Sequence, residues 1–395
     1  MIRGSRRTAV YICTDPGVPV LGSKGSSAHV RAVLTELLAR FDDVHLITCR
    51  LGGRPSGSLS RLVVHELGRP AGEVSRRERD LVALDGEVVR ILRQIDAGGS
   101  TPDVVYQRYS LWSCDPMELA SSRRWPAVLE INAPLIDEQV RHRQLVDRPT
   151  ATERSVRAIR GATFAFGVSG AVADWASHLA GRPVPVVANG VDPARFTPVS
   201  ASMSAWRGDV PTIGFVGTFK PWHDLDTVIE AGAALARDQS TRTARLLLIG
   251  DGPELARVRR RVGDLGLEST TEVTGAVGGD QIPDLLARVD IALAPYAANA
   301  QYFSPLKVFE YLAAGAAVVA SGIEGLGADL VDGHEAVLVE PGDRSAFVAA
   351  VRRLCADREL TRSLGRTGRA AACARFGWDR AVDTILRGTE AVTVA

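Results

Sequence analysis

Short apolar segments alternate with amphipathic segments along the whole chain, and this alternation predicts its elements. In the first half, apolar runs predict strands at residues 8–15, 44–48, 62–66, 104–106, 127–132, 163–169 and 184–187. In the second half, similar runs predict strands at residues 213–217, 245–250, 272–274, 291–294, 317–320 and 336–339. Strands that are apolar along nearly their whole length are typical of parallel sheets covered by helices on both faces. The pattern therefore predicts an α/β protein with two Rossmann-like domains.

The helical segments and the turn signals predict how these domains are divided. The clearest helical stripe is formed by Val30, Val33, Leu34, Leu37 and Leu38. The turn-forming run at 189–193 separates the two halves. We predict a first domain over residues 1–192, a second over 193–375, and a final helix over 376–395 that packs back on the first domain. Because ligands of open parallel sheets bind beyond the carboxyl ends of the strands, two such domains facing each other predict a site in the cleft between them.

Composition excludes several classes of protein. The net charge of +1 gives no support for nucleic-acid binding. The five cysteines include no CxxC pair, and no apolar run reaches the roughly 18 residues of a membrane helix. The chain begins without a signal-peptide core, so we expect a cytoplasmic protein with reduced thiols. No Ser/His/Asp triad and no metal-ligand cluster stands out, so no metal is expected.

Lysine is rare while arginine is abundant, which makes each lysine informative. Lys307 and Glu310 lie one helical turn apart in an otherwise apolar run from Ser304 to Gly315, so both side chains can face the same site. An ammonium group suits a phosphate, and a carboxylate offers two oxygens to ribose hydroxyls. The alternative is a surface ion pair, which the apolar neighbours of the two residues disfavour.

Two glycine-containing loops are candidate phosphate sites. Gly25 and Ser26 precede a helix whose N-terminus can attract an anion, although a flexible loop with a serine cap explains them too. This loop lacks the GxGxxG and P-loop spacings, which disfavours a nicotinamide dinucleotide. In the second half, the residues that can face a diphosphate, a base or a ribose are Gly217, Thr218, Lys220, His223, Gly252, Gly275 and Ala276. Ordinary turn geometry explains the last three nearly as well.

Polar side chains also follow two strands of the first half. Arg108 and the alternating pair Glu130 and Asn132 either bind sugar hydroxyls or form a structural hydrogen-bond network. Residues 141–160 are rich in arginine. They can contact an anionic acceptor or a membrane surface, but a solvated helix is the favoured interpretation.

Taken in order, these segments resemble the retaining glycosyltransferases of family 4, which have the GT-B fold. The motifs that carry the resemblance are the loop before Ser26, Val168-Ser169, Asn189-Gly190-Val191-Asp192, Gly217 with Lys220, Gly250-Asp251-Gly252-Pro253, and Pro305 to Gly315. In that family the carboxylate at the place of Glu310 binds the donor ribose. The first glutamate of the family's Glu-x7-Glu pair is replaced here by Tyr302. The chain instead resembles a subgroup that has the run Ser304, Pro305, Leu306 and Lys307. In that subgroup Lys307 and Lys220 would supply the positive charges that bind the donor phosphates.

The resemblance implies a metal-independent retaining glycosyltransferase with a nucleoside-diphosphate sugar as co-substrate and no other cofactor. The second domain would bind the donor, and the first would bind a small-molecule or glycan acceptor through Arg108, Glu130 and Asn132, with Tyr302 near the donor sugar. A secondary metabolite and a cell-envelope glycoconjugate are both open as acceptors, and peripheral membrane contact is a further expectation. The alternatives are a nucleotide-sugar 2-epimerase, for which Glu130 and Glu310 are the candidate carboxylates, and a non-catalytic nucleotide-sugar binding protein.

Overall fold

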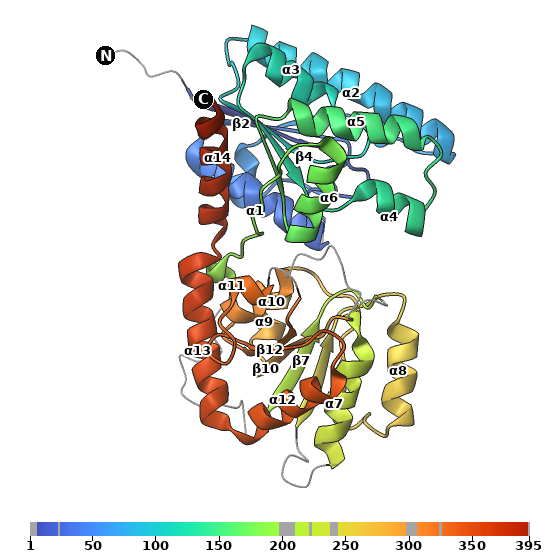
Figure 1. The fold of residues 1–395 in the computed structure, drawn as a ribbon, viewed down its shortest axis with the longest axis vertical. Helices are drawn as coiled ribbons and strands as arrows, with labels where there is room; N and C mark the ends of the chain where they lie inside the picture. Colours follow the sequence, from blue (N-terminus) through green and yellow to red (C-terminus); the bar gives the residue numbers. More distant parts are fainter. Residues whose placement is uncertain are drawn as a thin grey trace. The chain divides into compact units, whose positions relative to one another are not determined.

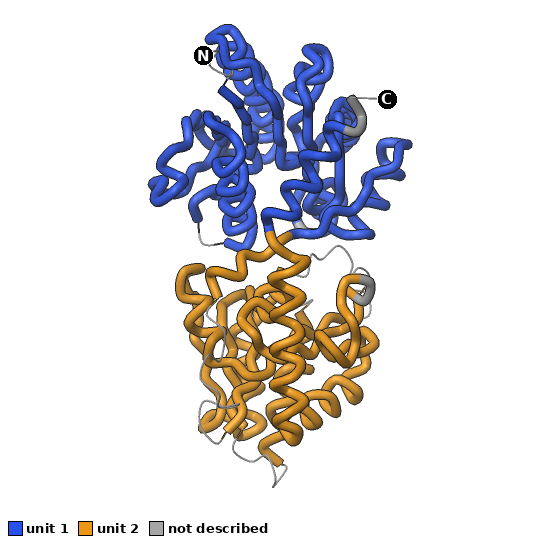
Figure 2. Tube along the Cα trace, turned by 90° about the vertical axis from the view of Figure 1, so that its left-hand side faces the viewer, with its two compact units in different colours: residues 1–189, 378–395 blue, residues 190–377 orange. Residues whose placement is uncertain are grey.

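The computed structural model describes residues 6–22, 24–196, 210–220, 223–237, 244–297, 306–323 and 326–393. The chain forms two compact units (Figure 2). The N-terminal unit comprises residues 1–189 together with 378–395, and the C-terminal unit comprises residues 190–377. No helix among the described residues is both long enough and apolar enough to cross a bilayer.

The N-terminal unit is built on a six-stranded parallel sheet in the order β3-β2-β1-β4-β5-β6. Its strands are β1 (Thr8–Cys13), β2 (Asp43–Thr48), β3 (Val63–Glu66), β4 (Val104–Arg108), β5 (Ala127–Ile131) and β6 (Phe164–Gly167). Every residue of β1, β4 and β5 is buried, as expected for strands with helices on both faces.

Helices cover this sheet, and one of them comes from the far end of the chain (Figure 1). The helices are α1 (Gly25–Arg40), η1 (Gly57–Arg61), α2 (Val74–Ala97), α3 (Asp115–Arg123), α4 (Leu135–His142), α5 (Arg148–Gly161), α6 (Gly170–Ala180) and α14 (Trp378–Thr393). Helix α14 packs against α1, β5 and β6. Its Gly388 fits against the ring of Phe164, where a Cβ atom would come within 2.6 Å of ring carbons.

The C-terminal unit repeats the architecture with the strand order β12-β11-β10-β7-β8-β9. Its strands are β7 (Thr212–Val216), β8 (Arg245–Ile249), β9 (Thr271–Val273), β10 (Ile291–Ala294), β11 (Ala317–Ser321) and β12 (Val337–Val339). Its helices are η2 (Pro193–Arg195), α7 (Leu225–Arg237), α8 (Leu255–Asp264), α9 (Ile282–Leu286), α10 (Leu306–Ala313), α11 (Leu326–Asp329), α12 (Arg344–Ala356) and α13 (Arg358–Arg375). Side chains of α7, α8 and α12 fill one apolar core of this unit, and side chains of α10 contribute to another.

The predicted α/β class with two parallel sheets is confirmed. One predicted strand, at residues 184–187, is wrong: Val186 makes only an isolated bridge to Gly167. Pro183 and Pro185 both precede Val186, and a proline has no N–H to donate to a strand ladder, so the pairing cannot extend toward Val184.

Candidate active site

The loops after β7, β8 and β9 are held together by glycines that pack against backbone. A Cβ atom on Gly250 would lie 2.0 Å from the carbonyl oxygen of Gly217, and one on Gly252 would lie 2.6 Å from the amide nitrogen of Phe219. Gly250 also forms an antiparallel bridge with Gly275. These glycines are therefore required by the close approach of neighbouring loops, which brings Gly217, Gly252 and Gly275 together at the carboxyl ends of adjacent strands.

Lys307 projects from the first turn of α10 toward the end of β7. Its Nζ atom is buried and has no hydrogen-bond partner in the described part of the chain. The ammonium group lies 4.3 Å from the centroid of the Phe215 ring, and a Cβ atom on Gly217 would be 3.1 Å from it. Burial lowers the pKa of Lys307 to about 7, with the carboxylate of Glu310 acting in the opposite direction. Nothing in the described protein satisfies its three donors, and such a group is costly to bury unless an anion completes it.

Glu310 lies one turn further along α10 and is partly buried. Burial raises its pKa, and the positive charges of Arg195 and Lys307 act against that rise. Arg195 belongs to η2 and donates a hydrogen bond from Nη2 to the carbonyl oxygen of Gly279, 3.1 Å away. Sequence reasoning missed Arg195, because nothing local links it to a residue more than a hundred positions later.

The loop after β7 holds His223, Thr218 and Lys220. The Nδ1 atom of His223 donates a hydrogen bond to the carbonyl oxygen of Thr218 at 2.6 Å, and its ring meets Phe215 edge-on. Burial and the nearby charge of Lys307 lower the pKa of His223 to about 3. His223 is therefore neutral at physiological pH. That His223 faces a diphosphate stays a prediction, and as a neutral side chain it would bring no positive charge to that contact.

The other predicted donor contacts that the structure describes lie in exposed loops or at the first residues of helices. Thr218 and Ala276 are exposed at their loops, and Leu306 begins α10. Gly25 is the first residue of α1, and a Cβ atom added there would meet nothing within 4 Å. Lys24, the residue before α1, makes no side-chain cap, and the first turn of α1 carries no acidic residue, so among the described residues these positions leave the helix N-terminus available to an anion. Tyr302, Ser304 and Pro305 lie outside the described residues.

In the N-terminal unit, Glu130 at the end of β5 is the centre of a buried polar network. Its side chain is completely buried. It accepts hydrogen bonds from Tyr106 at 2.7 Å, Asn132 at 2.7 Å and Arg108 at 3.3 Å, and it also pairs with His29. Burial alone would raise the pKa of Glu130, but His29, Arg108 and Tyr106 outweigh it and lower the pKa to about 2.

This network decides between the two interpretations that the sequence left open for Glu130. A carboxylate without exposed oxygens cannot contact a sugar, so the expected direct contact is corrected to a structural role. Glu130 fixes the side chains of Arg108 and Asn132, and Asn132 keeps a partly exposed surface. Arg108 itself is only 9% exposed. Of the three predicted acceptor contacts in this unit, Asn132 is the most accessible.

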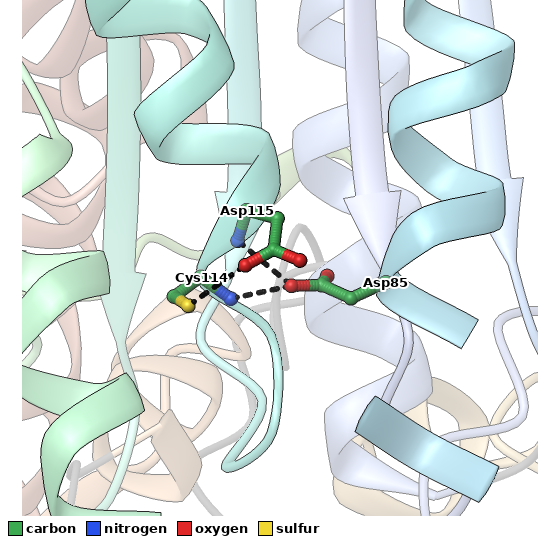
Figure 3. Close-up of side chains that lie close together, drawn as sticks. All are labelled: Asp85, Cys114 and Asp115. Carbon is green, nitrogen blue, oxygen red and sulfur yellow. Dashed lines mark hydrogen bonds between the residues drawn. The ribbon is translucent and has the colours of Figure 1, made fainter. Parts of the chain in front are cut away.

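A second buried polar cluster in the N-terminal unit caps a helix. Asp85, Cys114 and Asp115 are the only group of metal-ligand type that the described residues bring together (Figure 3). Asp85 accepts hydrogen bonds from the amides of Cys114 and Asp115, at 2.8 and 2.7 Å, and from Arg154 at 2.7 Å. Asp85 thus caps the N-terminus of α3, and the guanidinium group already occupies the position a cation would take. This cluster stabilises the packing of α2, α3 and α5.

Comparisons with known proteins identify both halves of the chain. Residues 23–195 match the family model described as Glycosyltransferase Family 4, and residues 210–357 match the one described as Glycosyl transferases group 1. A D-inositol 3-phosphate glycosyltransferase from Salinispora arenicola is 30% identical over 220 residues, which cover 51% of this chain and 48% of that protein. The chain spans between about half and 65% of the length of the first curated relatives it matches.

Solved structures of similar fold cover nearly the whole chain. Sucrose-phosphate synthase from Thermosynechococcus elongatus has a TM-score of 0.72 at 18% identity, covering 98% of this chain and all of that one. Anabaena HepE, solved in complex with UDP and glucose, has a TM-score of 0.70 at 17% identity, covering 97% of this chain and 99% of its own. The two units are thus similar, in order, to a family 4 and a group 1 glycosyltransferase domain, and the fold is the GT-B fold of these solved structures.

Proposed function

We propose that this protein is a metal-independent, retaining glycosyltransferase that moves a sugar from a nucleoside-diphosphate sugar to a hydroxyl acceptor. The observation that carries the proposal is the buried ammonium group of Lys307, which has no hydrogen-bond partner among the described residues and lies beside Gly217, where three glycine loops converge. A diphosphate supplies the missing negative charge and acceptor oxygens. The UDP bound to the HepE structure supports a ligand of this class.

In this proposal the C-terminal unit binds the donor. Glu310 accepts hydrogen bonds from the ribose hydroxyls, and the positive charges of Arg195 and Lys307 favour the ionised carboxylate against the effect of burial, which raises its pKa. When the bond between the sugar and the diphosphate breaks, negative charge grows on the leaving phosphate. Lys307, with Lys220 nearby, stabilises that charge in a site already organised to receive it. The leaving phosphate assists in taking the acceptor proton, so no enzymatic nucleophile is required.

The N-terminal unit supplies acceptor contacts, with Asn132 oriented by the buried carboxylate of Glu130. The same burial argues against the alternative 2-epimerase, because that chemistry needs accessible carboxylates for acid and base catalysis. Glu130 has no exposed oxygen and a pKa of about 2, so it cannot exchange protons with a bound sugar at neutral pH.

The test is incubation of the full chain with UDP-, GDP-, ADP- and dTDP-sugars and a panel of cyclitol, aminocyclitol and glycan acceptors. Release of nucleoside diphosphate together with a glycosylated product supports the proposal, and NMR of the new anomeric centre reports whether configuration is retained. Epimer formation, or nucleotide-sugar binding without turnover on any acceptor, contradicts it. Glu310→Ala should weaken donor binding at least about tenfold, whereas Glu268→Gln, an exposed charge change in the same unit, should leave binding unchanged.

A further inference from the structure

The C-terminal unit has a second concave surface, formed by residues that the proposed donor site does not use. Helices α7, α8 and α12 and the turn after α8 line a pocket of about 550 Å³. All three helices contribute to the same apolar core and lie together in Figure 1. The pocket is within the size range of small-molecule sites. Its lining includes neither Lys307 nor Glu310 nor any of the glycine loops.

Helical spacing explains how the pocket forms. Glu230, Ala233 and Arg237 recur along α7 at intervals of three and four residues, so they share one face of that helix. Ala233 and Ala349 place small side chains between α7 and α12, which leaves room that larger residues would fill. Glu230 of α7 and Arg344 of α12 approach each other to 3.7 Å. About two turns further along the same helices lie Arg237 and Arg352. The pocket therefore extends between α7 and α12 from Glu230 and Arg344 to Arg237 and Arg352.

Positive charge dominates this hollow. The charged side chains that line it are Glu230, Arg237, Arg261, Arg344 and Arg352. Arg344 is partly neutralised by Asp224 at 2.9 Å and by Glu230. No ion pair within the described part of the chain engages Arg237 or Arg261. Guanidinium groups that converge on a concave surface repel one another, and they attract anions strongly enough to raise the local concentration of a charged ligand.

We propose that this pocket is a second, separate ligand site that binds a small molecule carrying two or more phosphate groups. Arginine favours phosphate because its planar donors can form paired hydrogen bonds to two oxygens. Arg261 from α8 and the arginines of α7 and α12 approach from three helices, so they can contact more than one phosphate at a time. The phosphates can belong to a soluble metabolite or to a lipid headgroup, since both present the same chemistry.

The experiment isolates the pocket from the donor site. The Lys307→Met chain is titrated with inorganic pyrophosphate in a calorimeter at low salt. Binding should still be measured, because the pocket does not include Lys307. Adding Arg237→Ala and Arg261→Ala should weaken that binding at least about tenfold, since two charged hydrogen-bond donors are lost. The control is Arg259→Ala with Arg260→Ala, which removes the same charge from exposed positions of α8 that do not line the pocket.

The same variants distinguish the two sources of phosphate. The lipid probe is phosphatidylcholine vesicles that contain phosphatidylinositol 4-phosphate, whose headgroup carries two phosphate groups. Co-sedimentation of the Lys307→Met chain with these vesicles, lost in the Arg237/Arg261 variant but not in the control, assigns the site to a lipid headgroup. Pyrophosphate binding without such co-sedimentation assigns it to a soluble ligand. The proposal is overturned if neither probe binds the Lys307→Met chain, or if the control variant weakens binding as much as the pocket variant. Neither result bears on transfer activity at the donor site.

Discussion

The ammonium group of Lys307 is buried at a cost in stability, and it is the group that we propose binds the donor diphosphate. The ammonium group of Lys307 contacts the face of the Phe215 ring at 4.3 Å, and this cation–π contact replaces only a fraction of the hydration lost on burial. The pKa of Lys307 falls from 10.5 to about 7 for that reason. The folded state binds the proton less tightly than the unfolded state does, so the free energy of unfolding rises with pH between about 7 and 10.5.

Lys307→Met should therefore stabilise the protein while removing its donor binding. Methionine keeps the length and packing of the side chain without an unsatisfied buried charge, and we expect the free energy of unfolding to rise by about 1–3 kcal/mol at neutral pH. Urea denaturation measures the change, and calorimetry with UDP, GDP, ADP and dTDP measures binding. Arg260→Met, at an exposed position of α8 outside the site, is the control for loss of one positive charge. A Lys307→Met chain that is less stable than wild type, or that binds nucleotides normally, would remove this residue from the site.

The same lysine predicts a pH dependence of donor binding. A diphosphate binds the protonated form, so binding draws a proton onto Lys307 when the pH is above about 7. Affinity should fall by up to about tenfold per pH unit as the pH rises past that value. Calorimetry in two buffers of different ionisation enthalpy should show proton uptake near pH 8, and the uptake should vanish in Lys307→Met. Equal affinity on both sides of neutral pH in the wild-type chain would contradict this prediction.

At the scale of elements, the proposed donor site depends on how closely three strand–helix loops approach one another. Gly250 has a φ of +132°, and a Cβ atom added to it would lie only 2.0 Å from the carbonyl oxygen of Gly217, so no side chain fits there. The amide of Gly217 in turn donates to the carbonyl oxygen of Ile249 at 3.0 Å. The shape of these loops is thus set by backbone packing before any ligand arrives.

Gly250→Ala should separate the loops and cost about 3 kcal/mol or more of stability, from the positive φ and the steric clash together. Nucleotide binding should weaken in parallel. The matched control is Gly86→Ala in α2, where an added Cβ atom meets nothing within 4 Å and alanine is the better helix former, so stability should stay level or rise slightly. Thermal unfolding and nucleotide titration check both variants. Wild-type stability in Gly250→Ala would show that the loops can separate at no cost.

At the scale of the whole molecule, the chain returns to its first unit after completing the second. Helix α14 places Trp378 against the ring of His29, at 4.8 Å between centroids, and buries Val382 and Ile385. Arg40 of α1 pairs with Asp383 of the same helix at 2.8 Å. His29 also contacts Glu130, so the final helix supports the buried network at the end of β5.

Ending the chain at Gly377, which removes α14, should therefore destabilise the N-terminal unit. The loss of three buried apolar side chains corresponds to about 5 kcal/mol or more, which is close to the whole stability of a typical domain. Limited proteolysis followed by mass spectrometry should show cleavage concentrated in residues 6–189, with 190–377 protected. Ending the chain instead at Thr393, which keeps α14 intact, is the control. Equal protection of both units in the shorter chain would contradict the prediction.

The sequence alone determined the α/β class, the two parallel sheets and most strand positions, because continuous apolar strands and helical stripes are local patterns. It also singled out Lys307 and Glu310 from their spacing on one helix. Only the tertiary structure decided what surrounds them: the Phe215 ring lies under the ammonium group, and the positive charge of Arg195 acts on Glu310. It also decided the burial of Glu130, which turns an expected sugar contact into a support for Asn132. These facts depend on contacts between residues far apart in the chain. Burial and pKa arise from such contacts, which no local pattern records.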